Sequence, residues 1–423
     1  MTTPERRLLG GLTRIREFAG PDFRRYLAAT TVSSTGSALT GVALPLVVFG
    51  ETHSALLASL VVAVQVGPFL AFGLVAGAVA DRARRRRLMI ACDLVSGLAL
   101  VGLVICAALG VSIVPAAMTA AVVVQVAFVF FGAADFAAIP ALVGRNRVVE
   151  AQSALSSITI MVGLVVPAVA AALYGTIGPL PLFAIDAATF FFSAVMLTRV
   201  RSQFLSTSGD GRTPRRGLPA EIADGLRYLW REKVVRALTL IGACNAIGGG
   251  VIDAMLVVFA SRALGIVPED PRISMFFLAG SIGSLSGALA LPHLRRRLPV
   301  LTVTRVLLVC SGGAVALIAA APVAAVAIVA FAVWRATYGM TITNGITLRM
   351  QVLPDDYQSR VGSAARLIAL SGSPVGALLA GVLAGGTSIR VVIALAAVPI
   401  LAGIALASHF HQSLGSVPEA APS

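Results

Sequence analysis

Charge is scarce in this sequence of 423 residues. Only 12% of the residues are Asp, Glu, Lys or Arg and only 6% are aromatic, whereas about 25% of a typical soluble domain is charged. Hydrophobic residues make up 57% of the chain, which is more than the core of a water-soluble protein of this length can bury. The composition therefore excludes a soluble protein and predicts a chain that folds in the lipid bilayer.

Metal-binding and nucleotide-binding patterns are also missing. The four cysteines have no CxxC spacing, and the four histidines lie at loops and chain ends, so a zinc site and a disulfide framework are not expected. We expect the cysteines to be small, packed thiols. No glycine-rich phosphate-binding loop is present. We therefore expect no enzymatic activity, no metal and no cofactor, and an ion gradient as the source of energy.

Long apolar segments dominate what is present. A membrane-spanning helix needs about 20 mostly apolar residues. Twelve segments meet this length: 26–49, 56–80, 88–110, 115–143, 150–174, 180–199, 237–261, 273–293, 300–320, 322–348, 360–384 and 388–408. The polar stretch 200–235 separates the first six from the last six. The sequence predicts an all-α membrane protein with twelve transmembrane helices in two pseudo-symmetric six-helix bundles.

The polar segments complete the predicted organisation. Residues 1–25 form an N-terminal segment, 26–199 the first bundle, 200–235 a linker, 236–408 the second bundle and 409–423 a tail. Within the linker, Leu218–Lys233 has apolar residues at helical spacing, which predicts an amphipathic helix on the membrane surface. The linker and both termini are expected to lie on the same side of the membrane.

The basic residues indicate which side that is. Of the 33 basic residues, 27 fall in segments on the side of the termini and three (Arg262, Arg272 and Arg390) on the other side. By the positive-inside rule we expect the protein in the inner (plasma) membrane with both termini in the cytoplasm. The net charge of +14 therefore reflects topology. The arginine-rich stretch Gly77–Met89 has no interleaved aromatic residues, so a nucleic-acid partner is not expected.

The two halves of the chain contain similar segments. The stretch "GAVADRARRRR" after the second span corresponds to "GALALPHLRRR" after the eighth, and Asp135–Ala154 corresponds to Asn344–Ala364. Such a repeat is typical of transporters in which two bundles rock around a central site.

The first arginine-rich stretch carries a recognisable signature. Gly77, Asp81, Arg82, Arg85 and Arg87 match the pattern G-x-x-x-D-R-x-G-R-x-R, with Arg84 at the glycine position. On these residues the chain resembles the major facilitator superfamily, and in particular a branch that includes siderophore exporters and macrolide-efflux proteins. "GSALTGVALPLVVF" in the first span and "VLPDDYQSRVGSA" before the eleventh are similar to the same branch.

The resemblance implies roles for the signature residues. Asp81 would cap the start of the eleventh span, around Asp356–Val361, since a carboxylate is favoured at a helix N-terminus. Arg85 would bridge to Asp135, and the alternative is that Asp135 lines a cavity. Gly77 is expected to allow close packing. The other arginines of this stretch, Arg84, Arg86 and Arg87, are expected to set topology and contact anionic lipid.

Ionisable residues inside spans indicate a functional site, because they are costly in lipid. Arg335 and Asp253 lie about 21 and 24 Å from the inner ends of their spans at 1.5 Å per residue. We expect them to pair or to share a substrate, and the alternatives are a static ion pair or an Asp253 that faces outer water. A polar and aromatic stripe of a cavity is predicted from Trp334, Arg335, Tyr338, Thr341 and Asn344.

Two further residues, Asp186 and Asn245, complete the candidate site. Asp253 is the first candidate for a proton carrier, and Asp186 is the second unless it serves helix packing. Asn245 either lines the cavity or joins helices by hydrogen bonds.

The predicted function is secondary active transport by a monomer. It would use the proton gradient to export small amphipathic compounds, in contact only with substrate, protons and membrane lipids. The alternatives are a symporter or facilitator for uptake of a polar metabolite, and a membrane sensor or lipid flippase.

Overall fold

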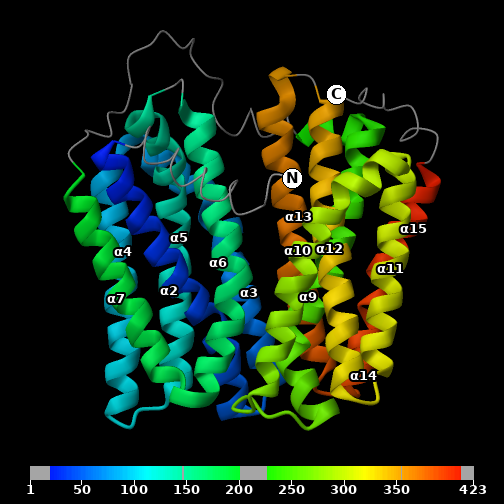
Figure 1. Ribbon diagram of the computed structural model, residues 1–423, viewed down its shortest axis with the longest axis horizontal. Coiled ribbons are helices and arrows are strands. Elements are labelled where there is room, and N and C mark those ends of the chain that lie inside the picture. Colours follow the sequence, from blue (N-terminus) through cyan, green and yellow to red (C-terminus); the bar gives the residue numbers. More distant parts are fainter. Residues whose placement is uncertain (1–19, 145–146, 201–225, 354, 411–423) are drawn as a thin grey trace, which may run out of the picture. The chain divides into compact units, whose positions relative to one another are not determined.

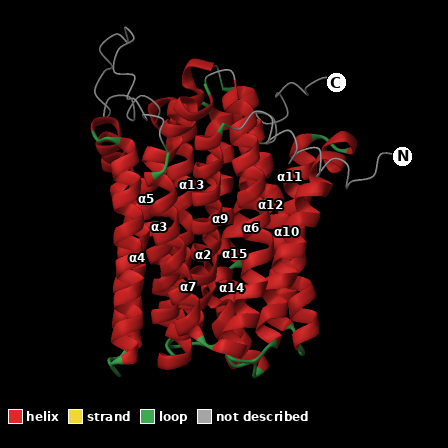
Figure 2. Cartoon of the chain, turned by 60° about the vertical axis from the view of Figure 1, so that its left-hand side comes forward, coloured by secondary structure: helices red, strands yellow, loops and turns green. Residues whose placement is uncertain are grey.

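The computed structural model describes residues 20–144, 147–200, 226–353 and 355–410 (Figure 1). These residues are helical apart from short connections and contain no strand (Figure 2). The helices are α2 (Pro21–Thr52), α3 (Ala55–Arg82), α4 (Arg85–Ala108), α5 (Ile113–Val143), α6 (Val148–Ile177), α7 (Pro179–Thr198), α9 (Lys233–Leu264), α10 (Arg272–Arg297), α11 (Val300–Ala320), α12 (Ala324–Val352), α13 (Asp355–Leu383), α14 (Ile389–Leu395) and α15 (Ala397–His409).

Each of the twelve predicted segments is helical, with two kinds of difference. Several helices run past the apolar residues into charged ones: α4 begins at Arg85 and α9 at Lys233, since Arg and Lys are good helix formers. The last segment is divided at Ala396 into α14 and α15. Pro399 explains this break, because a proline cannot donate a hydrogen bond to the carbonyl four residues earlier and is tolerated in a first helical turn.

The helices have the length and surface of membrane spans. Among the described residues, eleven helices are long and apolar enough to cross a bilayer, with Ile389–His409 taken as one, and Leu367–Leu383 is a shorter apolar helix. Large apolar side chains are exposed along them, including Leu98, Phe128, Ile160, Leu289 and Val382. Side chains of this kind are favourable in contact with lipid, and the backbone of a helix satisfies its own hydrogen bonds there.

The chain divides into two compact units. Unit 1 contains Ala71–Val166 and Ile177–Asp210 together with the beginning of α2, up to Ala43. In this unit α4 packs against α5 and α7. A core cluster draws on every helix of the unit: Phe23, Tyr26, Ala29, Ala80, Met89, Ala134, Ile139, Ala151 and Leu197.

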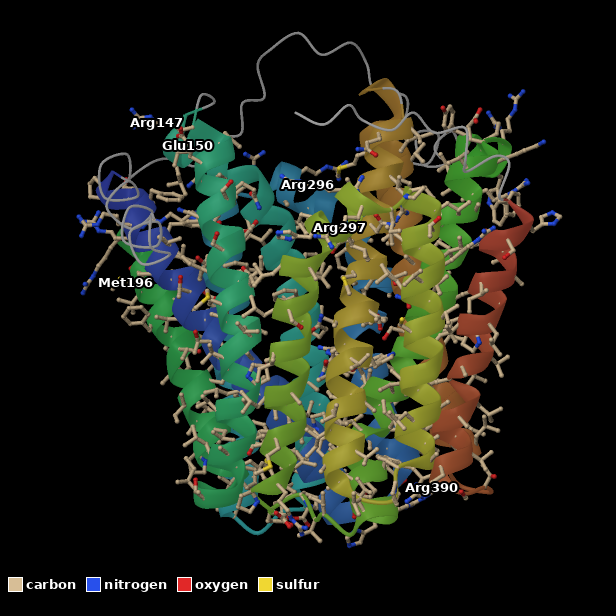
Figure 3. All side chains as sticks on the ribbon, turned by 45° about the vertical axis from the view of Figure 1, so that its right-hand side comes forward. Arg147, Glu150, Met196, Arg296, Arg297 and Arg390 are labelled. Carbon is tan, nitrogen blue, oxygen red and sulfur yellow. The ribbon has the colours of Figure 1, made fainter. Side chains whose placement is uncertain are left out.

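Unit 2 contains Gly211–Ser423, and α9 is its central helix. This helix packs against α12, α13, α14 and α15, while α12 also packs against α10 and α11. Arg296 and Arg297 lie at one end of the unit and Arg390 at the opposite end (Figure 3). These are called the Arg297 end and the Arg390 end below. The Arg390 end also holds the C-terminus of α9, because the guanidinium of Arg390 contacts the carbonyl of Ala263.

Unit 2 includes more than the second half of the chain. It also contains Leu44–Leu70 and Pro167–Thr176. These ranges are the last part of α2, the first part of α3 and the last part of α6. Each of these three helices contains a proline within three residues of the point where it passes between the units, namely Pro45, Pro68 and Pro167. A proline inside a helix removes one backbone hydrogen bond and is a common cause of bending.

Candidate substrate and coupling site

The structure brings Asp253 and Arg335 together in unit 2. A guanidinium nitrogen of Arg335 lies 3.3 Å from a carboxylate oxygen of Asp253. Asp253 lies eleven residues before the end of α9 at Leu264, and Arg335 eleven residues after the start of α12 at Ala324. Both are therefore about 16 Å from the Arg390 end at 1.5 Å per residue, which explains how helices far apart in sequence place the two charges at one depth.

The pair is partly exposed although it lies far from the helix ends. The side chain of Asp253 is 37% exposed and that of Arg335 is 33% exposed. Charged groups at such a depth are costly unless they face one another or an aqueous cavity. An ion pair that also presents polar surface can receive either a polar group of a substrate or a proton.

A stacked pair of aromatic rings lies beside the guanidinium of Arg335. The rings of Trp334 and Tyr338 are stacked with centroids 5.1 Å apart, and the guanidinium carbon lies 5.7 Å from the centroid of Trp334. Contacts of this kind are typical cation–π interactions. Gly249 on α9 lies against Tyr338, where a Cβ would come within 2.5 Å of the ring. A glycine is therefore needed at this position to leave the Tyr338 ring in place.

The predicted stripe on α12 is divided by the structure. Arg335 and Tyr338 are partly exposed, whereas Trp334, Thr341 and Asn344 are at most 5% exposed. These three side chains are buried inside unit 2, whereas the cavity stripe predicted from the sequence grouped them with Arg335 and Tyr338. The amide nitrogen of Asn344 donates to the hydroxyl of Thr304 on α11, at 3.0 Å. The helical period places a polar residue on a face, but packing of the neighbouring helices decides which face is interior.

Asn245 lies on α9, two turns before Asp253. Its side chain is 1% exposed, and neither its amide oxygen nor its amide nitrogen has a hydrogen-bond partner among the described residues. A buried amide normally has a partner. The described residues therefore show no hydrogen bond by which Asn245 joins two helices, which was one of its two predicted roles.

Asp186 lies inside unit 1, where it joins α7 to α2. Its carboxylate accepts hydrogen bonds from Thr40, at 2.5 Å, and from Thr189, at 3.2 Å, and the residue is fully buried. A Cβ on Gly36 of α2 would overlap both Asp186 and Thr189. The close approach of the two helices and the two hydroxyl donors support the packing role for Asp186.

The arginine-rich stretch is mostly helical. Helix α3 ends at Arg82 and α4 begins at Arg85, so the connection is only two residues long. Arg82 and Arg87 are exposed, and Arg85 is half-buried. The expected packing role of Gly77 is not seen among the described residues, because a Cβ there would meet no atom within 4 Å.

Arg86 has a structural role that the sequence did not indicate. Its Nε donates to the carbonyl of Leu197 at 2.8 Å, and its Nη2 donates to the carbonyl of Thr198. Arg25 donates to the next carbonyl, that of Arg199, at 3.0 Å. These carbonyls at the end of α7 have no partner within the helix. Arg86 therefore has a structural role in addition to the topological role and the lipid contact that were expected of it.

Asp135 has a partner that the sequence does not indicate. The hydroxyl of Tyr26 on α2 donates a hydrogen bond to its carboxylate. Tyr26 is fully buried, and a lone tyrosine at the start of an apolar span gives no signal of such a contact. The side chains of Asp81 and of residues 354–360 lie outside the described part of the chain, so the predicted cap on α13 stays a prediction, as does the bridge from Arg85.

Comparison with known proteins adds independent findings. Residues 26–377 match the family model described as Major Facilitator Superfamily. The chain is 27% identical over 390 residues to the multidrug efflux pump Tap of Mycolicibacterium fortuitum, covering 89% of this chain and 92% of the relative. It is 25% identical over 370 residues to the enterobactin exporter EntS of Salmonella typhimurium (strain LT2), covering 85% of each.

Solved structures show the same fold. A bacterial homologue of the human lysosomal transporter Spinster, in an inward-facing and unoccupied conformation, matches with a TM-score of 0.71 at 14% identity, covering 94% of this chain and 98% of that chain. A peptide transporter in complex with alafosfalin matches with a TM-score of 0.69 at 12% identity, covering 94% and 96%.

Proposed function

Since this chain belongs to the Major Facilitator Superfamily and is a multi-pass transporter of the cell membrane, we propose that it exports small amphipathic compounds by alternating access, driven by the proton gradient. The observation that carries the proposal is the partly exposed pair of Asp253 and Arg335. Relatives along 85% or more of the chain are named as exporters of drugs and of enterobactin, which supports export as the direction.

The surroundings of the pair support an amphipathic substrate. The partly exposed ring of Tyr338, which stacks on the buried ring of Trp334, provides apolar area next to the charges. Arg335 can bind a carboxylate or phenolate group. Asp253 is the proposed proton carrier. Loss of its proton restores the ion pair with Arg335, and arrival of the proton or of substrate breaks that pair, so the two cargoes compete for one site.

The signature residues are proposed to form a gate at the arginine-rich side. Asp81, at the end of α3, would cap the start of α13 in one state of the cycle, as the resemblance implies. Since the basic residues concentrate at this side, we propose that it faces the cytoplasm together with both termini.

The function is tested by export in an efflux-deficient host and in proteoliposomes. Expression of the chain is expected to raise resistance to amphipathic drugs, and the purified protein is expected to acidify or alkalinise the vesicle lumen only when drug is present. Asp253→Asn should abolish both effects, while Glu150→Gln, at an exposed carboxylate in the first turn of α6, is the matched control. Uptake of a nutrient without drug resistance would indicate a symporter, and movement of labelled lipid alone would indicate a flippase.

A further inference from the structure

The three arginines at the sparsely charged side of the membrane all have partners at the Arg390 end of unit 2. Arg272 forms an ion pair with Asp270 at 2.6 Å. Arg390 donates to the carbonyls of Ala319 and Ala321 at 2.9 and 2.7 Å. Because this side carries so few basic residues, each of them needs an explanation other than chance. The third, Arg262, differs from Arg390 in that one of its acceptors lies in the first half of the sequence.

Arg262 joins the two halves of the sequence. Its Nη2 donates to the carbonyl of His53 at 2.9 Å, and its Nη1 donates to the carbonyl of Ala384 at 3.1 Å. His53 directly follows α2, and Ala384 directly follows α13. Carbonyls at helix C-termini lack helical partners and carry the negative end of the helix dipole, so they are strong acceptors for a guanidinium.

The acceptor on the first half lies in an unusual backbone conformation. Among the described residues, His53 is the only non-glycine residue with a positive φ, at 49°. Its N–H donates to the carbonyl of Phe49 at 2.8 Å, which closes the end of α2. Glycine is the usual residue at such a position, and backbone strain of this kind is a pointer to a functional contact. Here the strained residue is the one whose carbonyl binds Arg262.

Two close approaches surround the Arg262 contact. A Cβ on Gly381 of α13 would overlap Ser59 and lie 3.1 Å from the Cα of Leu56, both on α3. A Cβ on Gly175 of α6 would lie 2.8 Å from the carbonyl oxygen of Glu269, in the loop between α9 and α10. The end of α6 is therefore packed directly against backbone of the second half, and the start of α3 packs on α13 through the small side chain of Ser59.

The loop that meets α6 is held by its own charges. Asp270 accepts hydrogen bonds from the backbone N–H of Arg272, at 2.8 Å, and from its guanidinium. These hydrogen bonds hold the pKa of Asp270 below its usual value. The loop therefore keeps its shape at neutral pH and loses this support only in acid, as the carboxylate becomes protonated.

We infer that Arg262 is a clamp that holds the ends of α2, α3 and α6 on the second half and that must release for the Arg390 end to open. The inference rests on the proposed alternating-access transport. Pro45, Pro68 and Pro167 lie where these three helices pass between the units, so the clamped ends are joined to unit 1 at points where a helix bends readily. Release of two hydrogen bonds is a small change, as a reversible step requires.

The test measures opening directly, without substrate. Spin labels are placed at Thr176 and Thr387, two exposed residues at this end, after the four native cysteines are replaced by alanine. Distances are measured by pulsed electron paramagnetic resonance in nanodiscs. Arg262→Gln is expected to raise the ratio of long to short distances by about 5- to 10-fold, the effect of losing one net hydrogen bond. Arg262→Lys should give a smaller rise, because an ammonium group does not span both carbonyls.

Arg390→Gln is the matched control. It removes the same chemistry at the same end. Among the described residues, however, the contacts of Arg390 are with the second half alone, namely three carbonyls and the ring of Phe259, so the distances should stay unchanged. Should Arg262→Gln not fold, Gly175→Ala inserts a methyl group against the Glu269 carbonyl and should produce the same rise. Gly163→Ala, on the same helix where a Cβ meets no atom within 4 Å, is its control.

The outcomes separate the clamp from the proposed function. Unchanged distances in Arg262→Gln, or an equal change in Arg390→Gln, would overturn the clamp even if the protein exports drugs. A rise confined to Arg262→Gln and Gly175→Ala would support the clamp even in a chain that exports nothing, in which case only the proposed export would fail.

Discussion

Breaking the Asp253–Arg335 pair distinguishes a working site from a static one. The perturbation is a double-mutant cycle of Asp253→Asn, Arg335→Gln and the combined variant. With 3.3 Å between the charged atoms, Coulomb's law gives about 5 kcal/mol at an effective dielectric constant of ~20 and about 1 kcal/mol in bulk water. Since roughly a third of each side chain is exposed, we expect a coupling free energy of about 2 kcal/mol.

Two assays are applied to the variants of the double-mutant cycle. Equilibrium unfolding in mixed micelles reports the coupling: each single variant should be destabilised, and the double variant should recover most of that loss. Drug export in proteoliposomes reports function, and the double variant should be as inactive as Asp253→Asn because it has neither a proton carrier nor a cationic partner for substrate.

Either of two results would refute the reasoning. Additive effects on unfolding, within about 0.5 kcal/mol, would show that the two charges do not interact in the membrane. Restored export in the double variant would show that the pair is only structural, which is the alternative that the sequence left open.

Three further predictions concern other residues. Gly249→Ala should displace the Tyr338 ring, cost about 1–3 kcal/mol of stability and reduce export. The control is Gly242→Ala, where a Cβ makes only ordinary contact at 3.8 Å. Equal effects of the two substitutions on unfolding and export would contradict the argument. Tyr26→Phe should lower the unfolding free energy by about 1–3 kcal/mol, because it leaves the buried carboxylate of its partner without that donor; an unchanged value would show another donor. Asp81→Asn should reduce export while membrane insertion, judged by surface labelling, stays normal; a full rate would leave the arginine-rich stretch with a topological role alone.

A common use of arginine emerges from the contacts in both units. Arg86 in unit 1 and Arg262 and Arg390 in unit 2 all donate to carbonyls at the C-termini of other helices. Such carbonyls must find a partner near the membrane surface, where water is the competitor. A guanidinium with five donors in a fixed plane can serve two of them at once, which an amide or a lysine cannot do as well.

The number and approximate extent of the helices were predictable from the sequence. Apolar length is a local property, and the bilayer imposes it on each span separately. The break at Ala396 was missed because it depends on one proline within an otherwise uniform apolar run. The depth of Asp253 and of Arg335 could also be counted along their helices, because an α-helix has a constant rise per residue.

Apart from Asp253 and Arg335, whose equal depths indicated a pair, only the tertiary structure decided which polar residues meet. The helical period and the depth along α12 predicted Trp334, Thr341 and Asn344 on one stripe with Arg335. Packing of the neighbouring helices instead buries Trp334, Thr341 and Asn344 in the interior of unit 2. Tyr26 and Arg262 gave no signal in the sequence, since their partners lie more than 100 residues away. The local sequence determined the spans and their charges, because solvation by lipid acts residue by residue, whereas contacts between helices depend on all the packed surfaces at once.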